Sequence, residues 1–154
     1  MSDLTRILWT SGLTVIGGTL IFVVGQLLSR FVIEPIHEQR KLIGEIADAV
    51  IFYANAYLTS DLTSIDAEER KRLDTAQQRY RQLATLLRSR THLIPAYSLL
   101  EKLKLVRRQT AVRQASSELI GLSNEVFSTS EHRFNSRIRR KERLAELLGL
   151  DLSG

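Results

Sequence analysis

The stretch ILWTSGLTVIGGTLIFVVGQLLS, residues 7–29, decides the architecture of this 154-residue chain. It contains no charged residue, although Arg6 and Arg30 flank it directly. A helix of this length reaches roughly 34 Å at about 1.5 Å per residue, enough to cross a hydrocarbon core of about 30 Å. A signal peptide would have a shorter apolar region and a small-residue cleavage site, which the following RFVIEPIHEQRK lacks. We therefore expect residues 1–33 to form a retained transmembrane anchor.

Positive charges beside this stretch predict its orientation. Arg6 precedes it, whereas Arg30, Arg40 and Lys41 follow it. Because the cytoplasmic flanks of membrane helices carry an excess of Lys and Arg, we expect a single-pass protein whose N-terminus lies outside. Residues 34–154 would then form a cytoplasmic domain, and the absence of cysteine is compatible with that compartment.

One side of the expected membrane helix consists of small residues. At about 100° per residue, one third of the circumference contains Thr10, Thr14, Gly18, Gly25 and Ser29. Lipid tails supply no hydrophobic force between helices, so association depends on close backbone approach at small residues. We expect these residues to form a helix–helix interface in a homo-oligomer. The alternative is that glycine is simply frequent in transmembrane helices.

Residues 34–154 have helical rather than strand-like spacing of apolar residues. Four stripes of apolar residues, spaced three or four apart, each cover one helix face that must be buried. They are Ile43, Ile46, Val50, Tyr53 and Tyr57; Leu73, Ala76, Tyr80, Leu83 and Leu87; Val112, Ala115, Leu119, Leu122 and Val126; and a weaker stripe of Phe134, Ile138, Ala145 and Leu148, which Lys141 interrupts. We expect an all-α protein, with one transmembrane helix followed by a cytoplasmic antiparallel bundle of about four helices. Ala49–Leu58 is apolar nearly all round, which indicates a central helix or a contact with membrane or partner.

Residues that start or stop helices divide this pattern. Pro35 either begins a new helix after the membrane span or kinks one continuous helix. Further boundaries are expected at a capping box formed by Asp66 and Glu69, at Pro95, at Gly149, and at the polar runs 59–64 and 128–130.

Two runs carry a resemblance to other proteins. The runs are IEPIHEQRKLIGEIADAVIFYANAY, residues 33–57, and ASSELIGLSNEVF, residues 115–127. They resemble recurring blocks in a group of small bacterial single-span membrane proteins with no assigned activity. The resemblance implies a bacterial source, an inner-membrane location and an anchored helical layout, and it implies no catalytic or binding residues.

The sequence disfavours enzymatic and metal chemistry. The absence of cysteine excludes disulfides, zinc–thiolate sites, iron–sulfur clusters and thiol nucleophiles. Glu34-Pro-Ile-His37 matches the Glu-x-x-His motif of di-iron bundles, but the required second copy is missing. No glycine-rich phosphate loop or G-x-S-x-G turn occurs in a suitable place. Glu38, Glu45 and Asp48 are expected to form local ion pairs with Arg40 and Lys41. We therefore expect no enzymatic activity, cofactor or metal.

The clearest cluster of positive charge lies near the C-terminus and contains Arg137, Arg139, Arg140, Lys141 and Arg143. It is a solvated face, a contact for anionic lipid or a partner, or a nucleic-acid site. Nucleic acid is disfavoured because base-stacking aromatic residues are nearly absent nearby. A second lipid candidate is PAYSLLEKLKLVRR, residues 95–108, which forms an amphipathic surface helix or a short connector packed on the bundle.

The leading functional hypothesis is a non-enzymatic, membrane-anchored interaction or scaffold module that binds an unknown protein partner or itself. The second hypothesis is a self-associating membrane effector or small channel-like oligomer, assembled through the small-residue face. An unrecognised enzyme of lipid or envelope chemistry is the third.

Overall fold

The computed structural model describes residues 3–58, 66–127 and 131–151, and regular structure within these ranges is entirely helical. The elements are α1 (Asp3–Leu28), a π-helical segment η1 (Ser29–Ile33), α2 (Glu34–Leu58), α3 (Ala67–His92), α4 (Tyr97–Lys102), α5 (Gln109–Glu125) and α6 (Glu131–Leu148). The expectation of an all-α chain with one long apolar N-terminal helix is confirmed. Among the described residues, one helix is long and apolar enough to cross a membrane, and it runs from Arg6 to Tyr53.

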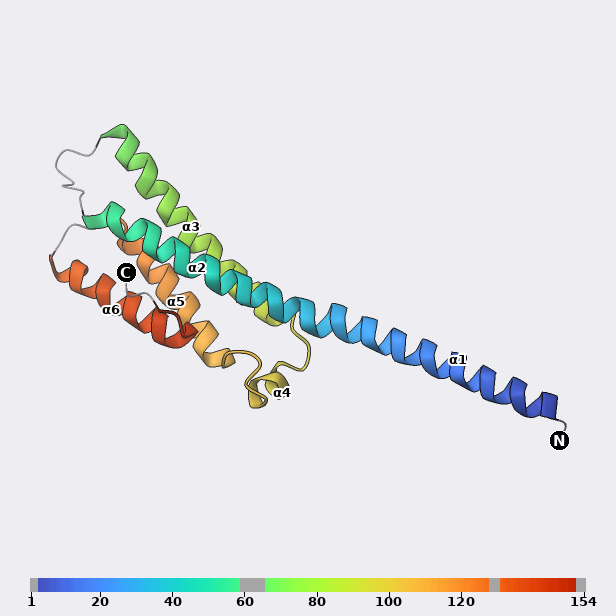
Figure 1. Ribbon diagram of the computed structural model, residues 1–154. Helices are drawn as coiled ribbons and strands as arrows, with labels where there is room; N and C mark the ends of the chain where they lie inside the picture. Colours follow the sequence, from blue (N-terminus) through green and yellow to red (C-terminus); the bar gives the residue numbers. More distant parts are fainter. Residues whose placement is uncertain (1–2, 59–65, 128–130, 152–154) are drawn as a thin grey trace.

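The helix continues from α1 through η1 into α2, as Figure 1 shows. Pro35 therefore does not begin a separate helix, and the alternative of one continuous helix is correct. In a regular α-helix the ring of Pro35 would crowd the carbonyl group of Phe31, four residues earlier. The wider π-helical turn contains Phe31 and is closed by the N–H group of Glu34, which donates to the carbonyl oxygen of Ser29. This local change of register accommodates the proline.

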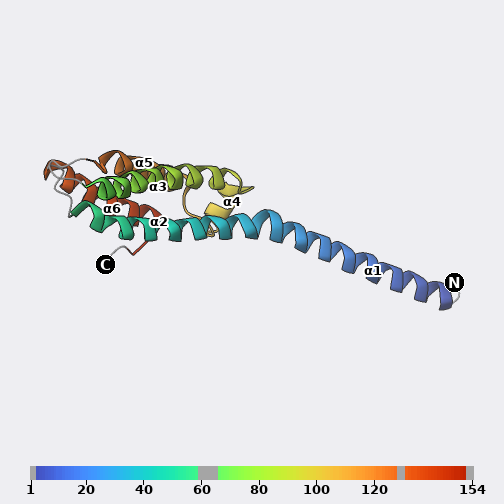
Figure 2. The same ribbon diagram turned by 90° about the horizontal axis from the view of Figure 1, so that it is seen from above.

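Four long helices build the main core beyond η1. Helix α3 packs against both α2 and α5, and α6 packs against α5 (Figures 1 and 2). Helices α3 and α5 run in opposite directions, since Ser116 of α5 donates to the carbonyl of Ala84 while Gln77 of α3 donates to that of Ser123. One apolar cluster joins residues of all four helices.

Two predicted stripes, on α3 and α5, are completely buried, and the α2 stripe is buried or half-buried where its side chains are described. The prediction for α6 is confirmed for Leu148, which is buried, and for Ala145, which packs against the core, but it is wrong for Ile138. Ile138 is 41% exposed, whereas Leu144, which the stripe omits, is fully buried. Arg140, which the stripe also omits, faces α5 and forms ion pairs there, so the face of α6 that packs on α5 includes Arg140 and Leu144. The side chains of Tyr57 and Phe134 lie outside the described residues.

The helix boundaries expected at Asp66, Pro95 and Gly149 are confirmed, although the 3.4 Å hydrogen bond at Asp66 involves Glu68 and not Glu69 of the expected capping box. Asp66 is the N-cap of α3, and its Oδ1 atom accepts from the N–H group of Glu68 at 3.4 Å. Pro95 lies between the end of α3 and the start of α4. Gly149 closes α6 with a left-handed φ of 61°, and the N–H group of Leu150 donates to the carbonyl of Ala145 at 2.9 Å. This is a Schellman cap. The breaks predicted at 59–64 and 128–130 lie outside the described residues.

Candidate functional site

The surface of α1 is apolar on every side and is not covered by the rest of the described chain (Figure 1). Its exposed side chains include Ile7, Leu8, Trp9, Leu13, Ile16, Leu20, Phe22 and Val24. A helix that is apolar all round normally lies in a protein core or in a membrane. Nothing in the described core provides such burial.

The predicted helix–helix interface lies open along α1. A β-carbon built on Gly18 or Gly25 would meet no atom within 4 Å. The hydroxyl group of Thr10 donates to the carbonyl of Arg6 at 2.7 Å, one turn earlier. The hydroxyl group of Thr14 donates in the same way to the carbonyl of Thr10 at 2.8 Å. These hydroxyls are thus satisfied within the helix and do not require a partner. Ser29 is the first residue of η1, where the α-helical register of this face ends.

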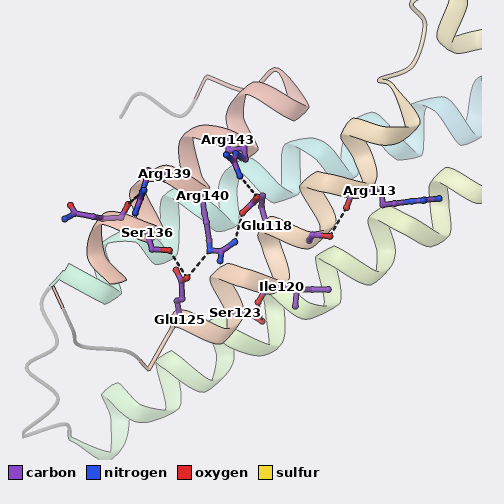
Figure 3. A network of polar contacts seen from close by, with 11 residues as sticks. Arg113, Glu118, Ile120, Ser123, Glu125, Ser136, Arg139, Arg140 and Arg143 are labelled. Carbon is purple, nitrogen blue, oxygen red and sulfur yellow. Dashed lines mark hydrogen bonds and ion pairs between the residues drawn. The ribbon is translucent and has the colours of Figure 1, made fainter. Parts of the chain in front are cut away.

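The predicted basic cluster on α6 divides into two groups. Arg140 lies against α5, where its Nη1 atom donates to Glu118 Oε2 at 2.7 Å and its Nε atom to Glu125 Oε1 at 2.9 Å (Figure 3). Arg137 donates to the backbone carbonyl of Glu125, and Ser136 Oγ donates to Glu125 Oε1 at 2.9 Å. Arg137 and Arg140 therefore hold α6 on α5.

The other three basic residues make fewer contacts with α5, and Arg139 Nε donates to the carbonyl of Asn135 within α6 at 3.3 Å. Arg139 is exposed, Lys141 is half-buried, and Arg143 has a side chain that is 70% exposed. Arg143 reaches Glu118 only at 3.5 Å. A lipid or partner contact stays a prediction for Arg139, Lys141 and Arg143.

Gly121 makes room for the guanidinium group of Arg140. It lies on α5 between Glu118 and Glu125, three and four residues from them, so all three residues share one face. Burial alone would lower the pKa of Arg140, but hydrogen bonds to Glu125 and Glu118 outweigh it and raise that pKa above its ordinary value. The arginine stays charged, and it forms ion pairs with two carboxylates whose side chains are only 12% and 13% exposed.

The sequence reasoning missed the roles of Glu118 and Glu125. Their separation of seven residues, two helical turns, places both on one face and could have indicated a shared cationic partner. The expectation of local ion pairs for Glu38 and Glu45 is wrong. Glu38 pairs with Arg90, and Glu45 with Arg79 at 3.1 Å, so both partners belong to α3. Because α2 packs against α3, the carboxylates of Glu38 and Glu45 pair with arginines of α3 and not with basic residues of α2.

A cleft of about 1080 Å³ lies between α2, the α4–α5 connection and the end of α6. Its charged lining consists of Arg40, Glu101, Lys102, Lys104, Arg107 and Arg108. The carboxylate of Glu101 accepts a hydrogen bond of 3.1 Å from the N–H group of Gln109, the first residue of α5. The remaining charges are positive, so the cleft suits an anionic group.

Within the described ranges, no three His, Cys, Asp or Glu side chains come together in a way that could hold a metal ion. No family model, curated protein or solved structure matches the chain. The arrangement of surfaces is therefore the basis for assigning a function.

Proposed function

We propose that this protein is a non-enzymatic interaction or scaffold module anchored in the bacterial inner membrane by α1. In this proposal the N-terminus lies outside, and residues 34–154 form a cytoplasmic antiparallel helical bundle. The supporting observation is that the buried apolar core contains no residue of α1, while α1 exposes large apolar side chains all round. An α-helix satisfies its own backbone hydrogen bonds, so burial in lipid is favourable for this segment.

A surface on α2 supports the binding of a protein partner. Ala49 and Val50 are buried in the core, whereas the next two residues, Ile51 and Phe52, are exposed. Phe52 is 75% exposed, and its ring packs edge-to-face on Tyr53 with centroids 5.1 Å apart. A supported aromatic side chain of this kind is typical of the anchors that dominate protein interfaces. We propose that Ile51 and Phe52 contact the unknown partner.

Reporter fusions test the anchor and its orientation. A reporter that is active only in the cytoplasm, fused after Gly154 of the full chain, should be active, because the positive flank of Arg30, Arg40 and Lys41 stays inside. A reporter that works only outside the cytoplasm should be inactive at the same position. The reverse pattern would refute the orientation, and recovery of the chain without membranes would refute the anchor.

Capture of the full-length protein in mild detergent tests the interaction module. We expect a foreign protein in stoichiometric amount, measured by the mass of the complex, and its loss in Phe52→Ser. The matched control is Ile120→Ser, which also removes an exposed apolar side chain, on α5. Equal capture by both variants would refute the α2 surface as the contact.

Self-association through α1 is a second candidate function. The observation that favours it is the line of small residues that contains Gly18 and Gly25. A β-carbon built on either glycine would have no neighbouring atom within 4 Å. A discrete homo-oligomer, with no foreign protein in the captured complex, would select this function over the first.

A further inference from the structure

The connector between α3 and α5 is fixed at the base of the apolar helix. Ile94, Tyr97 and Leu100 are buried there and pack with Val32 and Ile36. Figures 1 and 2 show α4 at the end of the helical domain from which α1 leaves. The connector thus belongs to the junction between the apolar helix and the domain.

Polar contacts hold this connector in place. Tyr97 Oη donates to the carbonyl of Arg107 at 2.6 Å and accepts from Nε2 of Gln39, a buried residue of α2, at 3.3 Å. Arg40 Nη2 donates to the carbonyl of Leu105 at 3.1 Å. Neighbouring residues of α2 therefore fix both the helix and the loop that follows it.

The outward surface of the connector combines apolar and basic side chains. Ala96 and Lys104, on either side of α4, have left-handed φ values of 49° and 57° and turn the chain there. The exposed apolar side chains are Leu93, Leu99, Leu103 and Leu105, with exposures of 71%, 57%, 60% and 45%. The exposed basic residues are Lys102, Lys104, Arg107 and Arg108. Glu101 is the one acidic residue among residues 93–108, and its carboxylate caps α5.

The depth of the connector follows from its packing partners. Val32 and Ile36 lie two and six residues after Arg30, which ends the uncharged stretch. At about 1.5 Å per residue, they lie roughly 3–9 Å beyond it along the helix. The headgroup layer of one leaflet is about 5–8 Å thick, from the difference between the whole bilayer and its hydrocarbon core. A connector packed on these two residues therefore lies at the level of the lipid headgroups.

We propose that residues 93–108, the α4 elbow, dock onto the anionic leaflet of the membrane that α1 crosses. The exposed leucines enter the boundary between headgroups and acyl chains, and Lys102, Lys104 and Arg108 contact lipid phosphate. Charge complementarity and headgroup depth single out anionic lipid as the occupant. This inference rests on the proposed membrane anchor, and it adds a second attachment that fixes the domain relative to the bilayer.

Fluorescent probes on the full chain in vesicles test the docking. The chain has no cysteine, so single cysteines can carry an environment-sensitive fluorophore. In vesicles of phosphatidylcholine with phosphatidylglycerol, a probe on Leu99→Cys should be quenched by lipids labelled near the headgroup. A probe on Ser117→Cys, an exposed position of α5, should stay in water. In pure phosphatidylcholine, quenching at Leu99→Cys should decrease.

Charge variants make the test quantitative. Lys102→Gln and Lys104→Gln should each lower the ratio of docked to undocked probe by about fivefold, which corresponds to ~1 kcal/mol per basic residue. The matched control is the pair Arg70→Gln and Lys71→Gln, which removes the same charge from exposed positions at the far end of α3. Equal losses in both pairs would overturn a specific role for the α4 elbow.

A probe on Leu20→Cys separates this inference from the anchor. If acyl-chain quenchers reach Leu20→Cys while Leu99→Cys stays in water, the docking is refuted and the anchor stands. If Leu20→Cys is not quenched, the anchor is refuted and the docking with it. Shielding of Leu99→Cys that depends on protein concentration, and not on phosphatidylglycerol, would indicate a protein contact and overturn the lipid assignment.

Discussion

Arg140 places its guanidinium group directly over Gly121, so that Nη1 is 2.5 Å from the position a β-carbon there would take. The two residues lie on different helices, α6 and α5, and the glycine permits the double ion pair with Glu118 and Glu125. This close approach sets the position of α6 on α5.

The variant Gly121→Ala should therefore destabilise the protein, although alanine is the better helix former. Helix propensity favours alanine by ~1 kcal/mol, but displacing Arg140 weakens charge-assisted hydrogen bonds worth about 1.5–3 kcal/mol each. In an Arg140→Gln background the same change should become stabilising. Urea unfolding of the full chain in mild detergent, followed by circular dichroism, measures both. The same sign in both backgrounds would show that Arg140 does not need the glycine.

The different burial of Leu144 and Ile138 on α6 predicts unequal costs when each side chain is truncated to alanine. Leu144→Ala should lower the free energy of unfolding by about 2–5 kcal/mol, because this side chain is completely buried. Ile138→Ala should cost much less, since its side chain is 41% exposed. The same unfolding measurement compares them. A larger loss of unfolding free energy for Ile138→Ala than for Leu144→Ala would show that the face containing Ile138 is the buried one.

The left-handed Gly149 should tolerate no side chain. Gly149→Ala should destabilise the protein by about 1–2 kcal/mol through backbone strain alone, and its β-carbon would also collide with the guanidinium group of Arg107. Gly44→Ala is the matched control, because this helical glycine has no atom within 4 Å of an added β-carbon. It should stabilise α2 by up to ~1 kcal/mol. An equal fall in the unfolding midpoints of Gly149→Ala and Gly44→Ala would contradict the explanation by the left-handed backbone of Gly149.

Tyr97 should make stability depend on alkaline pH. Burial is the main cause that raises the pKa of Tyr97 above its ordinary value of 10.0; Glu101 adds to the rise, and the hydrogen bond from Gln39 opposes it. The phenol therefore ionises more easily in the unfolded chain. Its contribution to stability is complete below pH 10.0 and is lost as the pH rises above it.

The variant Tyr97→Phe isolates this effect. It should cost ~1 kcal/mol at neutral pH through the lost hydrogen bond to the carbonyl of Arg107. Above pH 10.0 the difference between the parent and the variant should shrink. Urea unfolding of both proteins across this range measures the difference, and a constant difference would show that Tyr97 does not titrate with unfolding.

The small-residue face predicts that α1 self-associates in a membrane. Gly18→Leu and Gly25→Leu should each weaken association several-fold, because lost packing and interhelical hydrogen bonds are worth ~1 kcal/mol. Val23→Leu lies off the face and should change little. Crosslinking of cysteines placed at Thr14 and Ser29 measures the association. If both glycine variants crosslink as well as the parent, α1 does not associate through this face.

Local pattern predicted the long helices and several of their ends, but not the π-helical turn before Pro35. The uncharged residues 7–29, the buried stripes on α3 and α5, the N-cap at Asp66 and the left-handed Gly149 all depend on neighbours within a few residues. Helical periodicity, capping and backbone conformation are properties of short segments, so each can be read along the chain.

Contacts between distant segments could not be predicted in this way. The spacing of Arg140 cannot reveal that it meets Glu118 and Glu125, because the orientation of α6 depends on which ion pairs and which leucines fit against α5 together. The α4 elbow is a second example. Its basic and apolar residues suggested either a surface helix or a connector, and only packing on Val32 and Ile36 places it at the base of α1. The physical reason is that helix orientation and long-range ion pairing are set by how several faces are buried at once, whereas periodicity describes one face at a time.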